Sequence, residues 1–186
     1  MTTAAETKSA VTTWNIDSSH ASAEFKVKHM MIANVRGHFS GVKGSLTLDE
    51  ANVTNSKIEA TIDASTIDTR EPQRDAHLKS ADFLEVEKFP TLSFRSTKVT
   101  PNGDGELKVE GDLTIHGVTK SVIFNVEGPS PEHKDPWGNL RRAITATTKI
   151  NRKDYGLTWN AALETGGILV GEEVAITLEV EFIKAA

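Results

Sequence analysis

The residues best suited by type for chemistry lie in the stretch 65–94, where the apolar–polar alternation of the rest of the chain breaks down. This stretch contains Arg74, Asp75 and His77, residue types that catalytic and anion-binding sites use. On a helix, Arg74 shares a face with His77, whereas Asp75 lies nearer Lys79. Asp75 is therefore badly placed to orient His77, and we favour structural ion-pair roles for Arg74 and Asp75 over contact with a ligand head group.

The residues around this cluster predict a short helix. Pro72 stands where a helix would begin, and proline is favoured at the first helical position. Pro90 closes the segment, because the residue before a proline is biased towards extended structure. We expect Leu78 and Phe83 to anchor this helical insertion in the core.

The histidines do not form a recognised metal motif. None of the six has the spacing of a zinc site: His20, His29, His38, His77, His116 and His133. His20 and His29 fall on successive strand segments and could meet across a turn, which is the weaker alternative. We predict neither a metal nor a cofactor. The parity of its strand segment places His29 on the inner face, where its ring could meet a ligand.

Other catalytic signatures are missing from the sequence. The chain has no cysteine, which excludes a thiol nucleophile and thiolate metal ligands. Ser40 stands one place late for a nucleophile elbow, and the glycines at 166, 167 and 171 lack the lysine of a phosphate loop. We predict that the protein is not an enzyme.

The overall charge and hydrophobicity limit the partners and the location. The net charge of −5 argues against a nucleic-acid partner, which requires a basic face. No stretch approaches the ~20 apolar residues of a membrane span. The N-terminal residues 1–15 contain no apolar core of a signal peptide, so a cytoplasmic location is expected.

The remainder of the chain predicts an all-β domain. We expect residues 1–11 to be a flexible tail and residues 12–186 to be one domain with about nine strand segments of period-2 alternation. Long strands with one apolar face must bury that face, and closing into an antiparallel barrel also removes exposed edges. A two-sheet sandwich is the alternative. Strands of ten residues would span about 33 Å.

The inward-facing positions predict an unfilled tunnel. Several are small, and aromatic residues make up only 6% of the chain. The small ones are Gly41, Ala60, Ser96, Gly111, Ala146 and Thr148. A tightly packed or flattened core is the alternative. The residues expected to line the tunnel and bind its ligand are Phe25, Val27, His29, Phe39, Leu46, Ile58, Ile62, Leu78, Phe83, Phe94, Leu113, Ile115, Phe124 and Ile144.

Five motifs together resemble the YceI-like family of lipid/polyisoprenoid-binding proteins, over a region from Trp14 to Phe182. They are Trp14-x-Ile16-Asp17-x-x-His20, Phe25-x-Val27-x-His29, Ser65-x-Ile67-Asp68-Thr69 followed by Arg74-Asp75-x-His77-Leu78 and Asp82-Phe83, Gly111-x-Leu113-Thr114-Ile115-His116-Gly117-Val118-Thr119, and Ile150-Asn151-Arg152-x-Asp154-Tyr155-Gly156-Leu157. The resemblance implies an eight-stranded, lipocalin-like antiparallel barrel that holds a long isoprenoid or similar lipid. It also implies a homodimer, with no established enzyme activity and no metal.

The residues and the resemblance together predict a soluble carrier of a long apolar lipid, a polyisoprenoid or an isoprenoid quinone. The resemblance also implies a role in stress. Besides His29, the candidates for contact with the head group at the rim are Arg74, His77 and Arg142. The alternative is an enzyme that acts on a hydrophobic substrate inside the barrel, with His29 or His77 as the acid or base.

Overall fold

The computed structural model describes residues 11–186. The predicted tail, residues 1–11, lies outside the described residues except for Val11, the first residue of strand β1. The elements in chain order are β1 (Val11–His29), β2 (Ala33–Phe39), β3 (Val42–Asp49), η1 (Val53–Asn55), β4 (Lys57–Asp63), η2 (Ala64–Thr66), α1 (Pro72–Lys79), β5 (Thr91–Pro101), β6 (Glu106–Ile115), β7 (Val118–Glu127), β8 (His133–Lys134), β9 (Leu140–Asn151), η3 (Arg152–Tyr155) and β10 (Val170–Lys184).

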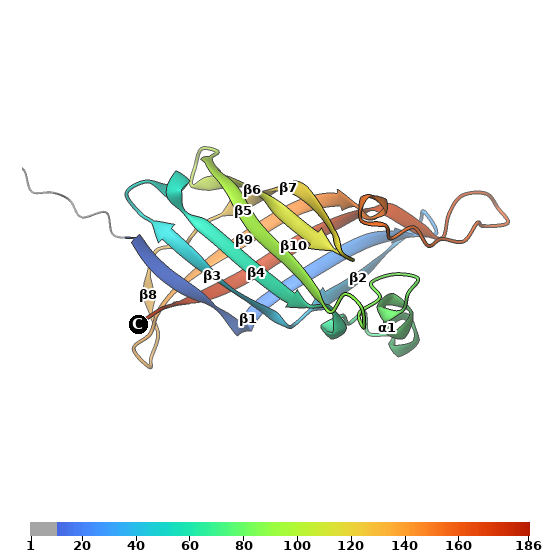
Figure 1. Ribbon diagram of the computed structural model, residues 1–186, viewed down its shortest axis with the longest axis horizontal. Coiled ribbons are helices and arrows are strands. Elements are labelled where there is room, and N and C mark those ends of the chain that lie inside the picture. The colour runs from blue at the N-terminus through green and yellow to red at the C-terminus, as the bar shows by residue number, and fades with distance from the viewer. Residues whose placement is uncertain (1–10) are drawn as a thin grey trace, which may run out of the picture.

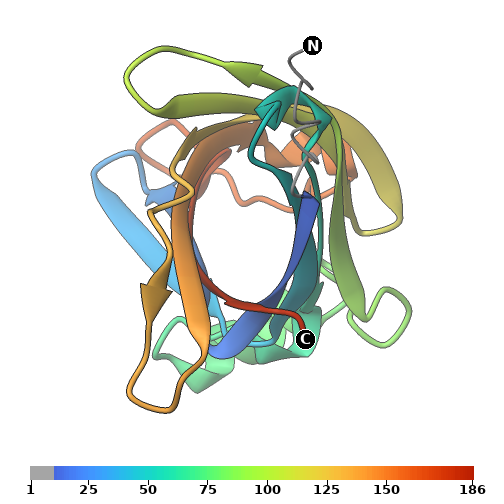
Figure 2. The ribbon, with the colours of Figure 1, turned by 90° about the vertical axis from the view of Figure 1, so that its left-hand side faces the viewer.

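The strands form a closed antiparallel barrel of eight, as the sequence and the resemblance predicted. The order β1-β3-β4-β5-β6-β7-β9-β10 returns to β1, because β10 pairs with both β9 and β1. Figure 2 shows this ring from one end, and Figure 1 shows the long, strongly tilted strands from the side. Closure leaves no long unpaired edge in the ring, which supports the barrel over the sandwich.

Strand β1 is longer than the sequence suggested. The alternation predicted successive strand segments here, and the structure joins them in one strand. The polar run around Ser18 interrupts the alternation without ending the strand, because a bulge between Ile16 and Ala21 absorbs the irregularity. The first half of β1 pairs with β3 and the second half with β2. Strand β8 pairs only with β9, at the margin of the sheet.

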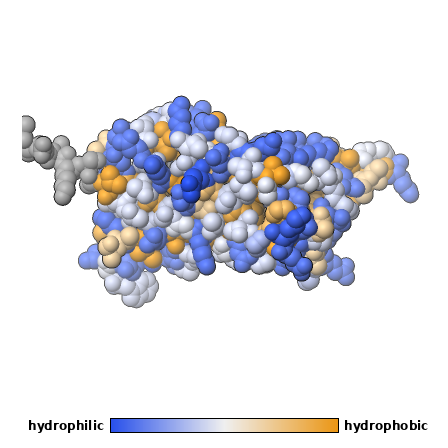
Figure 3. Space-filling model, in the orientation of Figure 1, coloured by the Kyte–Doolittle hydropathy of each residue, from blue (hydrophilic) through white to orange (hydrophobic). Residues whose placement is uncertain are grey.

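The core consists of two clusters of buried apolar side chains along the barrel axis. One is centred on Trp14 and Phe182, both fully buried, and the other contains Leu92, Ile115 and Tyr155. The face of the molecule in Figure 3 is mainly hydrophilic, with scattered apolar residues. The alternation predicted from the sequence therefore separates a dry interior from a polar exterior.

The helical insertion begins where Pro72 predicted. Helix α1 starts at Pro72, and the Glu71 side chain caps it by accepting hydrogen bonds from the backbone N–H groups of Gln73 and Arg74. The helix lies at one end of the barrel, while β8 and the C-terminus lie at the other (Figure 1). The two ends of the barrel are therefore flanked by different elements, α1 at one end and β8 at the other.

Candidate functional site

An apolar cavity of about 250 Å³ runs through the barrel interior. Its lining draws on both core clusters, from Leu48 and Ile144 in one to Leu92 and Ile115 in the other. Of the 40 lining residues, 35 are apolar, and the five polar ones are Glu24, Ser56, Lys57, Ser93 and Arg152. Such a cavity, with few polar groups, is typical of sites for small apolar ligands.

Thirteen of the fourteen predicted tunnel residues line this cavity, and the exception is His29. The pairing of β1 with β10 shifts register between Val27 and His29, at the last residue of the strand. The extra residues of this irregularity lie on β10, and the pairing of β1 with β2 stays regular through His29. His29 therefore keeps the parity of Phe25 and Val27 but lies beyond the cavity lining. Contact of the thirteen residues with a ligand stays a prediction.

The small inward residues leave less space than their size suggested. Ala60 and Ala146 line the cavity, but Gly111 does not. A Cβ atom built on Gly111 would lie 2.5 Å from the ring of Phe94, so that ring occupies the space beside the glycine. Gly41 lies between β2 and β3 and faces Thr66 instead. The tunnel is therefore narrower than a count of small residues implies.

The Arg74 and Asp75 side chains both bond to Thr69 and form no ion pair with each other. The Asp75 carboxylate accepts hydrogen bonds from the backbone N–H (2.9 Å) and hydroxyl (2.5 Å) of Thr69. The Arg74 guanidinium donates to the Thr69 hydroxyl at 2.7 Å and to the Thr69 carbonyl at 2.8 Å. Neither side chain lines the cavity. This geometry attaches the start of α1 to the segment before it.

His77 belongs to an aromatic cluster at the same end of the barrel. Its Nε2 atom lies 2.8 Å from Oδ2 of Asp82, and its ring makes edge contacts with Phe83 and Trp159. Phe83 lines the cavity, whereas His77 does not. No periodic pattern in the sequence marks Trp159, because this residue lies in an irregular segment.

Arg142 lies away from the other two rim candidates. It donates to the carbonyl of Ser130, pairs with Glu50, and places its guanidinium 5.1 Å from the ring of Trp14. Trp14 belongs to the core cluster opposite α1. The structure therefore separates Arg142 from Arg74 and His77, and the three cannot form one head-group site.

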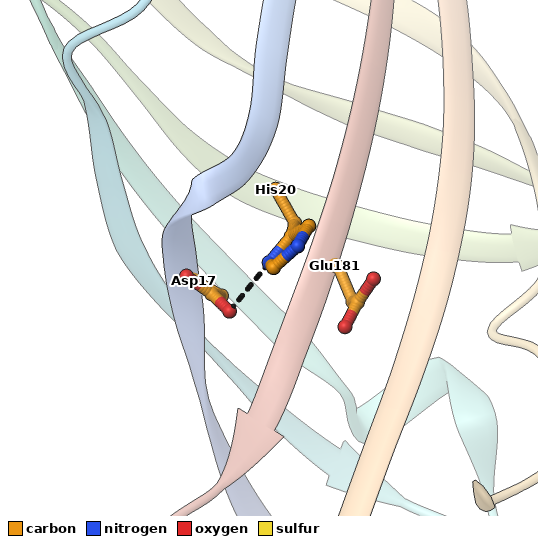
Figure 4. A group of neighbouring side chains, drawn as sticks. All are labelled: Asp17, His20 and Glu181. Carbon is orange, nitrogen blue, oxygen red and sulfur yellow. Dashed lines mark hydrogen bonds and ion pairs between the residues drawn. The ribbon is translucent and has the colours of Figure 1, made fainter. Parts of the chain in front are cut away.

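Asp17, His20 and Glu181 form the one group of three potential metal ligands found in residues 11–186 (Figure 4). The Arg141 guanidinium already binds two members of this group, since Nη1 contacts Asp17 at 2.8 Å and also pairs with Glu181. Its Nε atom lies 2.8 Å from Asp135. Hydrogen bonds from Ser19 and Arg141 hold the pKa of Asp17 far below its usual range. The arginine supplies the positive charge that a metal would otherwise bring.

The proposed meeting of His20 and His29 was wrong. Both residues lie on β1, with no turn between them. Nine residues of strand separate them by about 30 Å. His20 instead bonds to Asp17 through Nδ1 at 2.9 Å.

The comparison with known proteins identifies the family. The family model described as the YceI-like domain matches residues 14–182, the region that the motifs predicted. The chain belongs to the YceI-like family. A relative from Staphylococcus aureus (strain N315), UPF0312 protein SA2479, is 37% identical over 172 residues, which are 92% of this chain and 98% of the relative.

Two solved structures share the YceI-like barrel at low sequence identity. BcnA of Burkholderia cenocepacia superposes with a TM-score of 0.76 at 19% identity, covering 89% of this chain and 98% of BcnA. A domain from Saccharophagus degradans, described as a polyisoprenoid binding domain, gives a TM-score of 0.68 at 15% identity, with coverage of 92% and 98%. These likenesses establish the fold.

Within the late YceI-like motif, Arg152 and Tyr155 are buried polar residues on η3. Arg152 is 3% exposed and lines the cavity, and its guanidinium donates to three backbone carbonyls. The Tyr155 side chain is 1% exposed, and its hydroxyl has no hydrogen-bond partner among the described residues. The sequence did not indicate that Arg152 is buried, because its neighbours Lys153 and Asp154 are charged and exposed.

Proposed function

We propose that this protein is a carrier that holds a long apolar lipid, a polyisoprenoid or an isoprenoid quinone, in the barrel cavity. The observation that carries the proposal is the cavity itself, which is lined almost entirely by apolar side chains contributed by strands all round the barrel. Apolar cavities stay dry and accept apolar guests, whereas polar cavities hold water. A chain-like lipid matches a cavity that extends between both core clusters.

Hydrophobic burial alone gives useful affinity for such a ligand. Each CH₂ group removed from water contributes about 0.8 kcal/mol, so ten carbons contribute about 8 kcal/mol before association costs are subtracted. No catalytic constellation is needed for this role. His77 and its partner Asp82 do not line the cavity, and neither does His29, so the geometry favours binding over acid–base catalysis on a substrate inside the barrel.

Family membership supports the proposal, as does the Saccharophagus degradans neighbour described as a polyisoprenoid binding domain. The described residues include no helix long and apolar enough to cross a membrane. A cytoplasmic location, a homodimeric state and a role in stress remain predictions. Light scattering on the purified protein would determine whether it is a dimer.

The first experiment is native mass spectrometry of the purified protein, followed by organic extraction and identification of the bound molecules. We expect about one lipid per subunit, with an isoprenoid tail. Protein that carries no lipid and also fails to bind added isoprenoids would refute the carrier role.

A variant that fills the cavity tests where the lipid binds. Ala146 is 3% exposed and lines the cavity, whereas its neighbour Thr147 is exposed on the outer face of β9. We expect Ala146→Phe to reduce lipid occupancy to a small fraction of that of the wild type, at a stability cost of about 1–3 kcal/mol. The matched control, Thr147→Phe, adds the same side chain outside and should retain the lipid. Equal lipid content in both variants would place the ligand elsewhere.

A further inference from the structure

The turn between β1 and β2 exposes three consecutive large apolar side chains at one end of the barrel. Met30, Met31 and Ile32 form this turn, and they are 42%, 60% and 82% exposed. They are half of the six large apolar residues that are exposed within residues 11–186. Strand β2 pairs with β1 and lies outside the closed ring, so the turn ends a hairpin rather than a segment of the barrel wall.

The backbone of this turn does not favour methionine. The Ile32 N–H donates to the His29 carbonyl at 3.2 Å, and the two residues between them, Met30 and Met31, have φ angles of 51° and 64°. A type I′ hairpin turn requires two consecutive residues at positive φ, and asparagine and glycine are preferred there. Two strained residues that also expose large apolar side chains point to a role outside the folding of the hairpin.

The loop between η3 and β10 enlarges this apolar surface. The Met30 N–H donates to the Leu169 carbonyl at 2.8 Å, and a Cβ atom built on Gly167 would lie 3.8 Å from Cγ of Met31. Figure 1 shows the turn and the loop together at the right-hand end of the molecule, the end that also carries α1. The half-buried Ile168 and Leu169 join the turn in one apolar tip. We define the apolar tip as Met30, Met31, Ile32, Ile168 and Leu169.

Three cations lie behind the apolar tip, on the outer face of the same hairpin. Lys26 and Lys28 alternate with Phe25 and Val27, which line the cavity, so the two lysines point outwards. Arg36 on β2 lies directly opposite Lys26. None of the three cations forms an ion pair within residues 11–186. Like charges directly opposite each other destabilise a strand pair, so this arrangement does not serve the hairpin itself.

We propose that the apolar tip inserts into the surface of a bilayer that contains anionic lipids, with these three cations at the level of the head groups. Apolar side chains of interfacial segments lie about 5–10 Å deep, at the boundary between head groups and acyl chains. Lys28 stands two residues before Met30, about 7 Å along the strand, so its ammonium can contact the lipid phosphates. The net charge of −5 means that an anionic surface repels the rest of the molecule and selects this orientation.

Docking in this way would bring one end of the cavity to the bilayer. Val27 precedes the turn by three residues, Val170 directly follows Leu169, and both valines line the cavity. The inference goes beyond the proposed carrier function and does not depend on what the cavity holds. It concerns the outer surface of the hairpin alone.

Co-sedimentation with vesicles tests the docking. The full chain is mixed with vesicles of phosphatidylcholine alone, or of phosphatidylcholine and phosphatidylglycerol in equal amounts. We expect binding to the mixed vesicles to be at least about tenfold tighter and to weaken as salt is added, because salt screens the attraction between the cations and the lipids. Equal binding to both compositions would overturn the role of the cations, and no binding to the mixed vesicles at low salt would overturn the proposal.

A variant of the turn removes the apolar tip while keeping the hairpin. Met30→Asn, Met31→Gly and Ile32→Ser together place Asn-Gly in the type I′ turn, the pair that this turn prefers. We expect binding to the mixed vesicles to fall about tenfold or more. The control is Trp137→Ser, because Trp137 is also 82% exposed but lies between β8 and β9, at the opposite end. Loss of binding in the control alone would place the docking surface at that other end.

A second set of variants tests the charge. Replacing Lys26, Lys28 and Arg36 together by glutamine should abolish the preference for the mixed vesicles. The control removes the same charge from exposed positions of β5, β6 and β7, with Lys98→Gln, Lys108→Gln and Lys120→Gln. This control should keep the preference. Equal loss in both would show that only the net charge matters and would contradict the proposal.

Two further measurements distinguish docking from other events. Ala146→Phe fills the cavity and should bind the mixed vesicles as the wild type does, whereas its failure to bind would mean that sedimentation reports uptake of lipid into the cavity. Sedimentation velocity without vesicles should give the same mass for the wild type and the turn variant. A wild-type dimer that the turn variant dissociates would assign the apolar tip to an interface between two copies of the chain instead.

Discussion

At the scale of single residues, the interior holds two polar side chains that the apolar wall does not explain, Arg152 and Tyr155. Tyr155 is the only tyrosine of the chain, and its buried hydroxyl has no hydrogen-bond partner within residues 11–186. An unpaired buried hydroxyl typically costs about 1–3 kcal/mol, so its replacement could raise the free energy of unfolding. Because Tyr155 stands on η3 with Arg152, these two polar groups lie at the same end of the barrel.

Tyr155 offers a direct test of this buried environment. Burial raises the pKa of Tyr155 to about 12, compared with the usual value of 10.0. Ultraviolet titration of tyrosinate should therefore show ionisation near pH 12 in the folded protein and near pH 10 in denaturant. Because the folded pKa is the higher one, the contribution of Tyr155 to stability should be constant below pH 10 and should fall as the pH rises above it. Ionisation near pH 10 in the folded state would show that the ring is accessible.

Tyr155→Phe tests how the same hydroxyl affects the free energy of unfolding. Removal of an unpartnered buried hydroxyl should leave the free energy of unfolding unchanged or raise it by about 1 kcal/mol. Chemical denaturation measures the difference. A loss of more than about 1 kcal/mol would mean that the hydroxyl has a partner in solution.

At the scale of the elements, α1 is held by a polar anchor rather than by apolar packing alone. Thr69 is 5% exposed and receives side-chain contacts from both Arg74 and Asp75. Leu78 and the following Phe83 line the cavity. The helix is thus both attached to the barrel and part of the wall, so its attachment controls one end of the cavity.

Thr69→Val should loosen this helix. The substitution conserves shape but leaves the Arg74 Nε and an Asp75 oxygen each without one hydrogen bond, at a cost of about 1–3 kcal/mol. Hydrogen exchange of the amides in α1 should accelerate relative to those of β6. The control is Thr61→Val on the exposed face of β4, which should change neither measurement. Unaltered exchange in α1 would show that apolar contacts suffice to hold the helix.

At the scale of the whole molecule, the two ends of the barrel have different electrostatics. Near the end that carries β8, Arg141 contacts Asp17, Asp135 and Glu181. Hydrogen bonds from Ser19 and Arg141 lower the pKa of Asp17, and the Arg141 contact lowers the pKa of Asp135, both well below the usual 3.8. Because a lowered carboxyl pKa stabilises the folded state above the unfolded pKa, this contribution is present above about pH 4 and is lost progressively as the pH falls.

Arg141→Gln should therefore lower stability at neutral pH and flatten the loss of stability below pH 4. Chemical denaturation at a series of pH values measures both effects. Arg95→Gln is the matched control, because its ion pair with Glu59 is exposed and such pairs contribute little. An acid profile identical to that of the wild type would show that Arg141 does not set the titration of these carboxylates.

Lipid binding should also appear in the stability of the whole barrel. A ligand at 100 times its dissociation constant stabilises the folded state by about 2.7 kcal/mol, which corresponds to roughly 5–10 °C for a domain of this size. Thermal unfolding with and without added isoprenoid should show this shift in the wild type and a much smaller one in Ala146→Phe. A shift of the same size in both would indicate binding outside the cavity.

Much of this molecule follows from local sequence. Period-2 alternation identified the strands and the inward row of most cavity residues, because a strand places successive side chains on opposite faces. Pro72 marked the start of α1 for an equally local reason. Parity did not show that the cavity lining ends before His29, the last residue of β1, because the extent of the cavity depends on how the distant strands pack around it.

Only the tertiary structure decided which polar residues share an environment. The sequence by itself determined an all-β chain with a dry interior, a short helical insertion and membership of the YceI-like family. It could not show that Arg141 meets Asp17, 124 residues away, or that Arg152 enters the cavity wall while Lys153 stays outside. Periodicity in the sequence predicts on which face of a strand a residue lies. Whether a charged side chain is buried, and what it pairs with, depends on which distant segments of the chain pack against it.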